Sequence, residues 1–253
     1  MRPGVAFIVI NVLVWNEYYH ELKEETVAKA YPNGIHNAIR EFLAIEDDIA
    51  VTVATFDEPE YGLNCERVDA ADVIIWWGHV RHDEVPDEIA ERVANAVLQG
   101  CGFIGLHSAH MSKPFRKLMG TTCHLRWRDG DRERIYTVAP YHQIARGIPD
   151  VFEIPDEEMY GERFDIPNPT DVVFMGWFAG GEVFRSGVTF DRGYGKVFYF
   201  QPGHETNPIY GIPVVQDIIK NAVRWAARCN TRQSLESPGA AESPEKNNYT
   251  RCR

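Results

Sequence analysis

The sequence predicts an α/β protein whose central sheet is mostly parallel. Strand-like apolar runs alternate with helix-like segments through the first half of the 253 residues, a pattern typical of a parallel sheet covered by helices on both faces. The length favours a single large domain, which we expect over residues 1–230. Residues 231–253 are rich in Ser, Pro, Glu, Lys and Asn with almost nothing to bury, so we expect a disordered tail there.

The spacing of apolar residues places the elements of this first half. Apolar runs bounded by turn residues predict strands over 5–14, 49–56, 73–77 and 103–106. One apolar face predicts a helix over 35–45, and a second helix runs from Pro86 at its first turn to about Leu98. The polar stretch 17–30 fits a solvent-facing helix or an ordered loop.

The second half departs from the alternating pattern. Residues 121–138 predict an antiparallel hairpin insertion, with 125–127 and 134–138 as its strands. The stretch 141–169 is rich in Pro, Gly and acidic residues, so we expect a long ordered loop. Three strands and a final helix then follow, over 172–178, 183–190, 196–200 and 213–228.

Composition narrows the classes of function. A formal charge of −11 argues against nucleic acid or an anionic membrane as partner, because phosphate binding relies on clustered Lys and Arg. No apolar run reaches the roughly 20 residues of a membrane span, and no signal peptide is recognised, so we expect a cytoplasmic protein. The five scattered cysteines indicate neither a disulfide framework nor a cysteine-rich zinc site. A homo-oligomer stays open.

Nucleotide cofactors are not expected. No Gly-x-Gly-x-x-Gly follows the first strand, so the dinucleotide fingerprint is missing. The first-strand loop, Trp15-Asn16-Glu17, also lacks the small residues that would surround a flavin phosphate. A carboxylate beside aromatic side chains instead favours a polyhydroxylated, sugar-like ligand.

Polar side chains follow four of the predicted strands. Ligands of open parallel sheets bind outside the carboxyl ends of the strands, where neighbouring connections diverge. This rule selects Trp15-Asn16-Glu17, Gly78-His79, His107-Ser108-Ala109-His110 and Gly203-His204-Glu205. We expect His79, His107 and His204 to share one pocket and name them as candidate ligands of zinc or another divalent metal. The spacing is non-local and carries no metal signature of its own.

The segment 102–108 has the layout of a strand-to-turn elbow that displays one side chain at the head of a helix. The displayed residue is His107, which can ligate a metal or shuttle a proton. Ser108 is the alternative nucleophile, for a serine hydrolase. Acid or base groups are offered by the loop that holds Glu158 and Tyr160, where a solvated acidic loop is the alternative, while His142 could orient that loop. His82 is expected at the surface, and His20, His36 and His124 stay open between surface and site.

An ordered series of motifs resembles the trehalose utilisation (ThuA-like) family, over about Val5 to Arg228. The motifs are Val14-Trp15-Asn16-Glu17, Tyr31-Pro32-Asn33-Gly34-Ile35-His36, Trp76-Trp77-Gly78-His79, Gly105-Leu106-His107-Ser108-Ala109-His110 and Val197-Phe198-Tyr199-Phe200-Gln201-Pro202-Gly203-His204-Glu205. Glu157-Glu158-Met159-Tyr160 resembles a further element of the family, and His142-Gln143-Ile144 departs from its His-Pro-Ile element by one residue.

The resemblance implies a flavodoxin-like, class I glutamine amidotransferase-like three-layer fold, and a role in the catabolism of trehalose and related disaccharides by way of 3-keto sugars. The elbow lacks the cysteine that amidotransferases need, so glutaminase activity is not expected. The leading hypothesis is an isomerase, hydrolase or lyase acting on a keto-glycoside, and the alternative is a non-catalytic sugar-binding or regulatory protein. The expected catalytic residues are Glu158, Tyr160, His110 and Glu17, and the expected substrate contacts are Trp15, Asn16, Trp77, His142 and Glu205.

Overall fold

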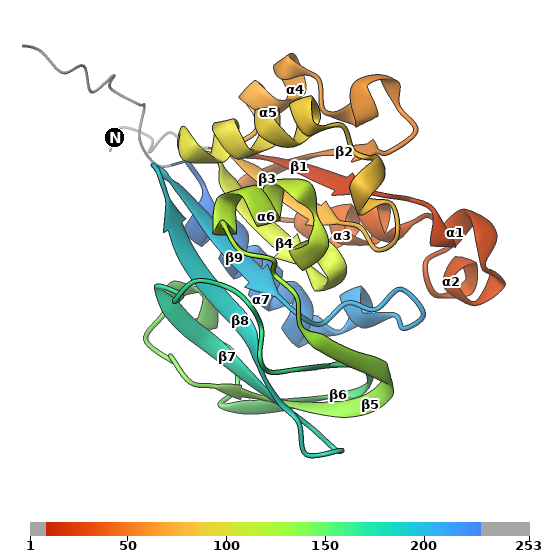
Figure 1. Cartoon of the computed structure of the whole chain (residues 1–253), viewed down its shortest axis with the longest axis vertical. Coiled ribbons are helices and arrows are strands. Elements are labelled where there is room, and N and C mark those ends of the chain that lie inside the picture. Colours follow the sequence, from red (N-terminus) through yellow and green to blue (C-terminus); the bar gives the residue numbers. More distant parts are fainter. Residues whose placement is uncertain (1–8, 229–253) are drawn as a thin grey trace, which may run out of the picture.

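The computed structural model describes residues 9–228, which form one nine-stranded sheet with helices on both faces (Figure 1). The strand order is β2-β1-β3-β4-β9-β8-β7-β5-β6. The bounds are β1 Ile10–Asn16, β2 Ile49–Thr55, β3 Val73–Trp77, β4 Gly102–Leu106, β5 Arg126–Thr137, β6 Val151–Gly161, β7 Asp171–Phe178, β8 Val183–Arg192 and β9 Gly195–Phe200. The predicted tail over 231–253 lies outside the described residues.

The first five strands of this order, β2-β1-β3-β4-β9, are parallel. They form the flavodoxin-like order, so the expected fold class is confirmed. The helices are α1 His20–Lys23, α2 Glu25–Ala30, α3 Ile35–Leu43, α4 Cys65–Ala70, α5 Asp87–Leu98, α6 Lys113–Met119 and α7 Pro213–Ala226. No helix within residues 9–228 combines the length and the apolar character needed to cross a membrane.

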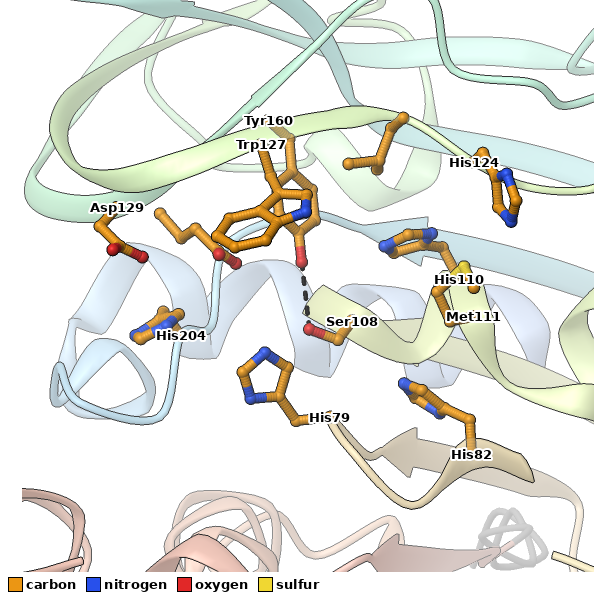
Figure 2. A pocket seen from close by; sticks show the side chains of 12 residues that line it. His79, His82, Ser108, His110, Met111, His124, Trp127, Asp129, Tyr160 and His204 are labelled. Atoms are coloured by element: carbon orange, nitrogen blue, oxygen red, sulfur yellow. Dashed lines mark hydrogen bonds between the residues drawn. The ribbon is translucent and has the colours of Figure 1, made fainter. Parts of the chain in front are cut away.

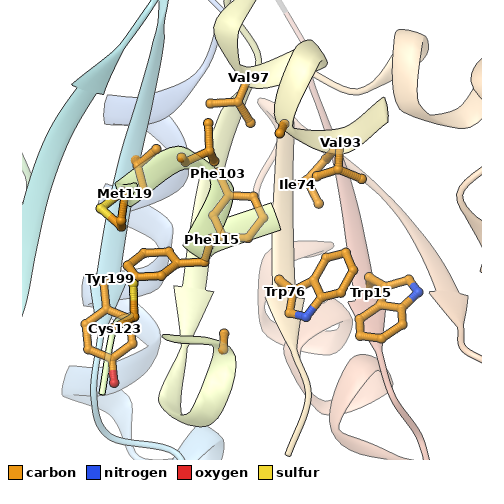
Figure 3. Packing of buried hydrophobic residues seen from close by; sticks show 14 of the residues in the cluster. Trp15, Ile74, Trp76, Val93, Val97, Phe103, Phe115, Met119, Cys123 and Tyr199 are labelled. Atoms are coloured by element: carbon orange, nitrogen blue, oxygen red, sulfur yellow. The ribbon is translucent and has the colours of Figure 1, made fainter. Parts of the chain in front are cut away.

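Two apolar cores lie on opposite faces of the sheet, because side chains alternate along each strand. One face packs against α4, α5 and α6, and the other against α3 and α7 (Figure 1). The first core is rich in aromatic rings: Trp15 stacks on Trp76 with ring centroids 3.9 Å apart, and Phe115 lies between Phe103 and Tyr199 (Figure 3). These cores fix the carboxyl ends of the parallel strands.

The antiparallel part of the sheet differs from the prediction in two places. The expected hairpin over 121–138 is a single long strand, β5, which pairs with β6 on one side and β7 on the other. Its turn-like Asp129-Gly130 is a bulge, where the register with β6 shifts.

The expected loop over 141–169 is wrong in its middle, where β6 forms the edge of the sheet. An edge strand tolerates Pro155, because one row of its backbone groups needs no ladder partner. Glu153 forms salt bridges with Arg132 and Arg134 of the neighbouring strand β5. This acidic side chain of the predicted loop is therefore compensated within the sheet.

Candidate active site

A cavity of about 470 Å³ lies where β3 and β4 end, and β5 and β6 form its opposite wall (Figure 2). His79 comes from the connection after β3, Ser108 and His110 from the turn after β4, and His204 from the loop after β9. The wall supplies side chains at alternate positions of its two strands, since alternate residues of a strand share a face. The cavity thus joins the parallel and antiparallel halves of the sheet.

Three imidazoles converge beside this cavity. One nitrogen each of His79, His107 and His204, and one carboxylate oxygen of Glu158, lie within 4.8 Å of one another. We call these four residues the histidine cluster. The ring centroids of His107 and His204 are 5.4 Å apart, and those of His79 and His204 are 5.7 Å apart. The structure therefore brings together the three histidines selected from the strand ends, while metal binding itself stays a prediction.

The Nδ1 atom of each of these rings has a partner outside the cluster. Nδ1 of His79 lies 2.8 Å from Oε1 of Glu205, Nδ1 of His107 is 3.0 Å from the carbonyl oxygen of Gln201, and Nδ1 of His204 is 2.7 Å from the hydroxyl of Thr206. Such partners fix the orientation of a ligating ring and leave Nε2 for the metal. For His79 and His107, whose Nδ1 atoms face oxygen acceptors, this is the arrangement of a ligating histidine; Nδ1 of His204 lies near both the hydroxyl and the backbone N–H of Thr206.

Glu158 faces His107 inside the cluster. Its buried Oε2 atom lies 3.1 Å from Nε2 of His107 and has no other partner among the described residues. Without a metal, a protonated His107 can supply the hydrogen between these two atoms while its Nδ1 donates to Gln201. A metal ion on Nε2 would replace that proton, so the pair can hold either a proton or a metal ion.

His107 occupies the elbow expected after β4. Its backbone has a φ of +51°, a conformation that only a few per cent of non-glycine residues adopt. The hydroxyl of the buried Tyr199 donates to the carbonyl oxygen of His107 over 2.8 Å, which stabilises the turn. The ring itself is completely buried. The sharp turn directs the imidazole toward Glu158 instead of into the following helix.

Two buried carboxylates hold the loops that carry the other histidines. Glu17 accepts the backbone N–H groups of His79, Val80 and Arg81 over 2.8–3.1 Å. Glu157 accepts those of Gly203 and His204 over 2.7 and 3.1 Å. Each carboxylate fixes the backbone of one cluster residue from a different element, so both act as positioning groups.

The charges of these carboxylates and imidazoles are coupled. Burial works against a charged His107 ring, but the contact with Glu158 and the charges of Glu157 and Glu205 outweigh it and raise the pKa of His107 to about 9. Burial also raises the pKa of Glu157 to about 7, because the nearby His107 and the backbone donors only partly offset it. For Glu158, the interaction with His107 outweighs burial and lowers the pKa, so this carboxyl is ionised at neutral pH.

Four further polar side chains of the cavity wall, those of Ser108, Tyr160, His82 and His110, are uncharged at neutral pH. The hydroxyl of Tyr160 lies 3.1 Å from that of Ser108 and 3.4 Å from Nε2 of His107, and burial raises the pKa of Tyr160 well above its usual value. Burial lowers the pKa of His110 and of His82 to about 3. The expectation that His82 lies at the surface is wrong, because it lines the cavity.

Several residues expected to contact a ligand lie elsewhere. Trp15 is buried, and its indole N–H donates to the carbonyl oxygen of Tyr61. Trp77 is also buried and donates to the carbonyl oxygen of Gly203. The side chain of Asn16 is held inside the protein by Glu21 and His36. None of these lines the cavity; only Trp77 among them holds the backbone of a loop beside it, at Gly203.

Three further residues expected at the site make positioning contacts instead. Glu17 binds the backbone after β3, and Glu205 contacts Nδ1 of His79; neither residue lines the cavity. His142 accepts a hydrogen bond from the backbone N–H of Ile144 and packs against Trp225 of α7, away from the histidine cluster. Three histidines could lie either at the surface or in the site. Nε2 of His20 lies 3.2 Å from Nδ1 of His79, His36 is buried against Asn16, and His124 lines the cavity.

Sequence reasoning missed Glu157, Trp127 and Asp129. Glu157 carries no signal of its own, because it lies in a run of acidic residues and contacts distant backbone. For Trp127 and Asp129, the available signal is the alternation along a strand. Leu125, Trp127 and Asp129 are spaced by two and all line the cavity, as do Glu158 and Tyr160 on β6. That spacing predicts one strand face.

Comparison with known proteins identifies the family. The family described as trehalose utilisation, ThuA, matches residues 11–226. The chain belongs to the ThuA family. No curated protein sequence matches it. For this ThuA chain, membership supports a general role in sugar catabolism, and the resemblance read from the motifs is confirmed.

Solved structures agree with the fold of the ThuA chain. A ThuA-like protein from Parabacteroides merdae has 15% identity and a TM-score of 0.63, over 90% of this chain and 94% of that one. A ThuA-like protein from Bacteroides uniformis has 14% identity and a TM-score of 0.62, over 89% and 94%. A cytoplasmic protein from Salmonella typhimurium has 14% identity and a TM-score of 0.56, over 86% and 99%. At these identities the likeness concerns the fold.

Proposed function

We propose that this ThuA protein is a divalent-metal-dependent enzyme of sugar catabolism that moves a proton next to the carbonyl group of a keto-glycoside. The observation that carries the proposal is the convergence of three Nδ1-anchored imidazoles and an ionised carboxylate beside one cavity. Family membership supports the sugar, and the motif resemblance implies the ketone; a base beside a candidate metal site suits such a substrate. We also propose a cytoplasmic location, as stated for the Salmonella relative.

His79, His107 and His204 are the residues that would hold the cation. Three histidines with an open fourth position are a ligand set that catalytic zinc sites use. A bound divalent cation would act as a Lewis acid toward a carbonyl oxygen. The three rings come from three separate connections, after β3, β4 and β9, so the site forms only in the folded protein.

Glu158 is the base in this proposal. A ketone acidifies the C–H bond beside it, and the carboxylate takes that proton while the C–H electron pair moves toward the carbonyl oxygen. Return of this proton to the former carbonyl carbon isomerises the sugar, provided that the hydroxyl proton of the neighbouring carbon passes to the former carbonyl oxygen. Alternatively, the electrons of the enolate form a C=C bond and break the glycosidic C–O bond, and the proton goes to the departing glycosidic oxygen. Neither route needs a further reactant, and a cation held by the neighbouring imidazoles would keep Glu158 ionised for the first step.

Tyr160 supplies a hydrogen-bond donor beside the base. Its raised pKa keeps the phenol protonated at neutral pH, so it can donate to an oxygen of the substrate. Ser108 offers no second mechanism of comparable quality, because among residues 9–228 its hydroxyl pairs with Tyr160 and with no imidazole. A serine hydrolase would need an adjacent base.

The test measures metal content and turnover separately. Purified protein is analysed for metals, washed with EDTA, reloaded with zinc, and assayed with 3-keto-trehalose. We expect turnover that disappears with the metal and returns on reloading. His204→Ala should lose both metal and turnover, whereas Glu158→Gln should keep the metal and lose at least about 100-fold in turnover, as removal of a general base does.

Three outcomes would contradict the proposal. Loss of metal from Glu158→Gln would make Glu158 a fourth ligand instead of the base. Full turnover of keto-glycosides by metal-free protein would remove the metal from the mechanism. Tight binding of the sugar without any product would favour a sugar-binding or regulatory protein.

A further inference from the structure

Trp127 lies at the edge of the cavity without a partner in the described part of the protein. Its side chain is 63% exposed, and no hydrogen bond, stacking or cation contact involves it. The other tryptophans have such partners: Trp15 and Trp76 stack on each other, Trp77 donates a hydrogen bond, and cationic side chains lie against Trp177 and Trp225. An exposed aromatic ring in a cavity wall suggests a ligand that covers it.

The strand register places Trp127 on the same wall as the catalytic candidates. Trp127 of β5 pairs with Tyr160 of β6, and directly paired residues point to the same face of a sheet. Glu158, two residues before Tyr160, shares that face, and Asp129, two residues after Trp127, also lines the cavity. Figure 2 shows the Trp127 ring beside Tyr160, with Asp129 farther along the same wall. One ligand can therefore reach both Trp127 and the histidine cluster.

The charge of the wall selects against phosphorylated sugars. Its lining within the described residues contains no Lys or Arg, but does contain the carboxylates of Asp129 and Glu158. At the end of the cavity that holds Trp127, away from the histidine cluster, a sugar phosphate would bring a dianion toward Asp129 without a lysine or arginine to receive it. An uncharged ring presents C–H groups that pack on the negative face of an indole, and hydroxyls that donate to a carboxylate.

We propose that Trp127 and Asp129 form an outer subsite that stacks and hydrogen-bonds the second ring of an unphosphorylated disaccharide. The assignment of the first ring to the histidine cluster rests on the proposed function; the stacking on Trp127 does not. The cavity of about 470 Å³ falls in the range of 300–1,000 Å³ that ligand sites usually show. The subsite would therefore select disaccharides over single sugars.

The test uses calorimetry with trehalose, which lacks the ketone and is not expected to react. Trp127→Ala should weaken trehalose binding about three- to tenfold, in line with the strength of aromatic stacking, and Trp127→Phe should keep most of it. The matched control is Tyr141→Ala, which removes an aromatic ring that is 81% exposed and outside the cavity; its affinity should not change. Trehalose 6-phosphate should bind more weakly than trehalose.

Metal content and turnover are measured on the same variants, so that the two proposals fail separately. Trp127→Ala should retain its metal, and its KM for a keto-disaccharide should rise while its KM for a keto-monosaccharide stays constant. The wild-type protein could lack both metal and turnover while its trehalose affinity still depends on Trp127. That result would contradict only the proposed function. Equal trehalose affinity in Trp127→Ala and wild type, no trehalose binding to wild type, or tighter binding of the phosphate would overturn the outer subsite.

Discussion

Replacement of Glu17 separates a positioning role from a catalytic one. Its Oε2 atom alone accepts the N–H groups of His79, Val80 and Arg81 over 2.8–3.1 Å, and the residue is 1% exposed. Glu17→Ala would leave up to three N–H groups without their acceptor. Each unpaired buried group costs about 1–3 kcal/mol, and because all three are close to the surface, water would recover part of this. We expect a loss of about 3–5 kcal/mol in the free energy of unfolding.

The loss should extend to the histidine cluster. The loop that Glu17 fixes carries His79, and removal of such supporting contacts usually weakens metal binding about 10- to 100-fold. Glu17→Gln, which keeps one carbonyl oxygen but places an amide near the N–H donors, should show an intermediate effect on both properties. Urea unfolding measures the first quantity, and competition with a chelator measures the second.

The control is Glu25→Ala, because Glu25 is exposed and, within residues 9–228, its side chain pairs only with the exposed Lys29; the stability of this variant should change by less than about 0.5 kcal/mol. A catalytic Glu17 predicts a different pattern: Glu17→Gln would then keep stability and metal affinity and lose turnover alone. That result would refute the positioning role derived from the backbone contacts.

Three further predictions concern the scaffold around the site. Gly102→Ala should lower the free energy of unfolding by at least about 1–3 kcal/mol, because the added Cβ would lie 2.5 Å from the carbonyl oxygen of Ala226. In the control Gly211→Ala, the added Cβ would have nothing within 4 Å, and urea unfolding should show almost no change in stability. Arg224 holds Asp48 and Glu46 and lowers the pKa of both carboxyls, so their contribution to stability is present above the unfolded pKa values and is lost as pH falls through the folded ones. The difference in urea midpoint between wild type and Arg224→Gln should therefore shrink from pH 7 to pH 3, and a constant difference would contradict this linkage. Tyr199→Phe should cost about 1–2 kcal/mol, because the buried carbonyl of His107 loses its donor, and unchanged stability would show that the elbow does not need this bond.

The convergence of the histidines could be predicted from the sequence because it depends only on topology. Parallel strands end at one edge of a sheet, so His79, His107 and His204 meet there whatever the details of packing. The partners that make these rings suitable ligands could not be predicted in the same way. Glu157 reaches the backbone of Gly203 across the sheet, and neither spacing nor composition encodes a contact between segments 46 residues apart.

Trp15 and Asn16 were expected to contact substrate but are buried, and the cause is different: side chains of a strand point alternately to its two faces, and both faces of this strand are covered. Trp15 and Leu13 lie in the core under α4 to α6, whereas Val12 and Val14 lie in the opposite core. The strand runs on to Asn16, two residues beyond its expected end, so Trp15 is still inside the sheet. In a buried parallel strand both faces are apolar, and alternation leaves no mark in the sequence that shows where burial ends. At the start of β5 and the residue before it, where one face meets the cavity, the alternation of Leu125, Trp127 and Asp129 survives in the sequence, and there the alternation does identify the residues that a ligand can reach.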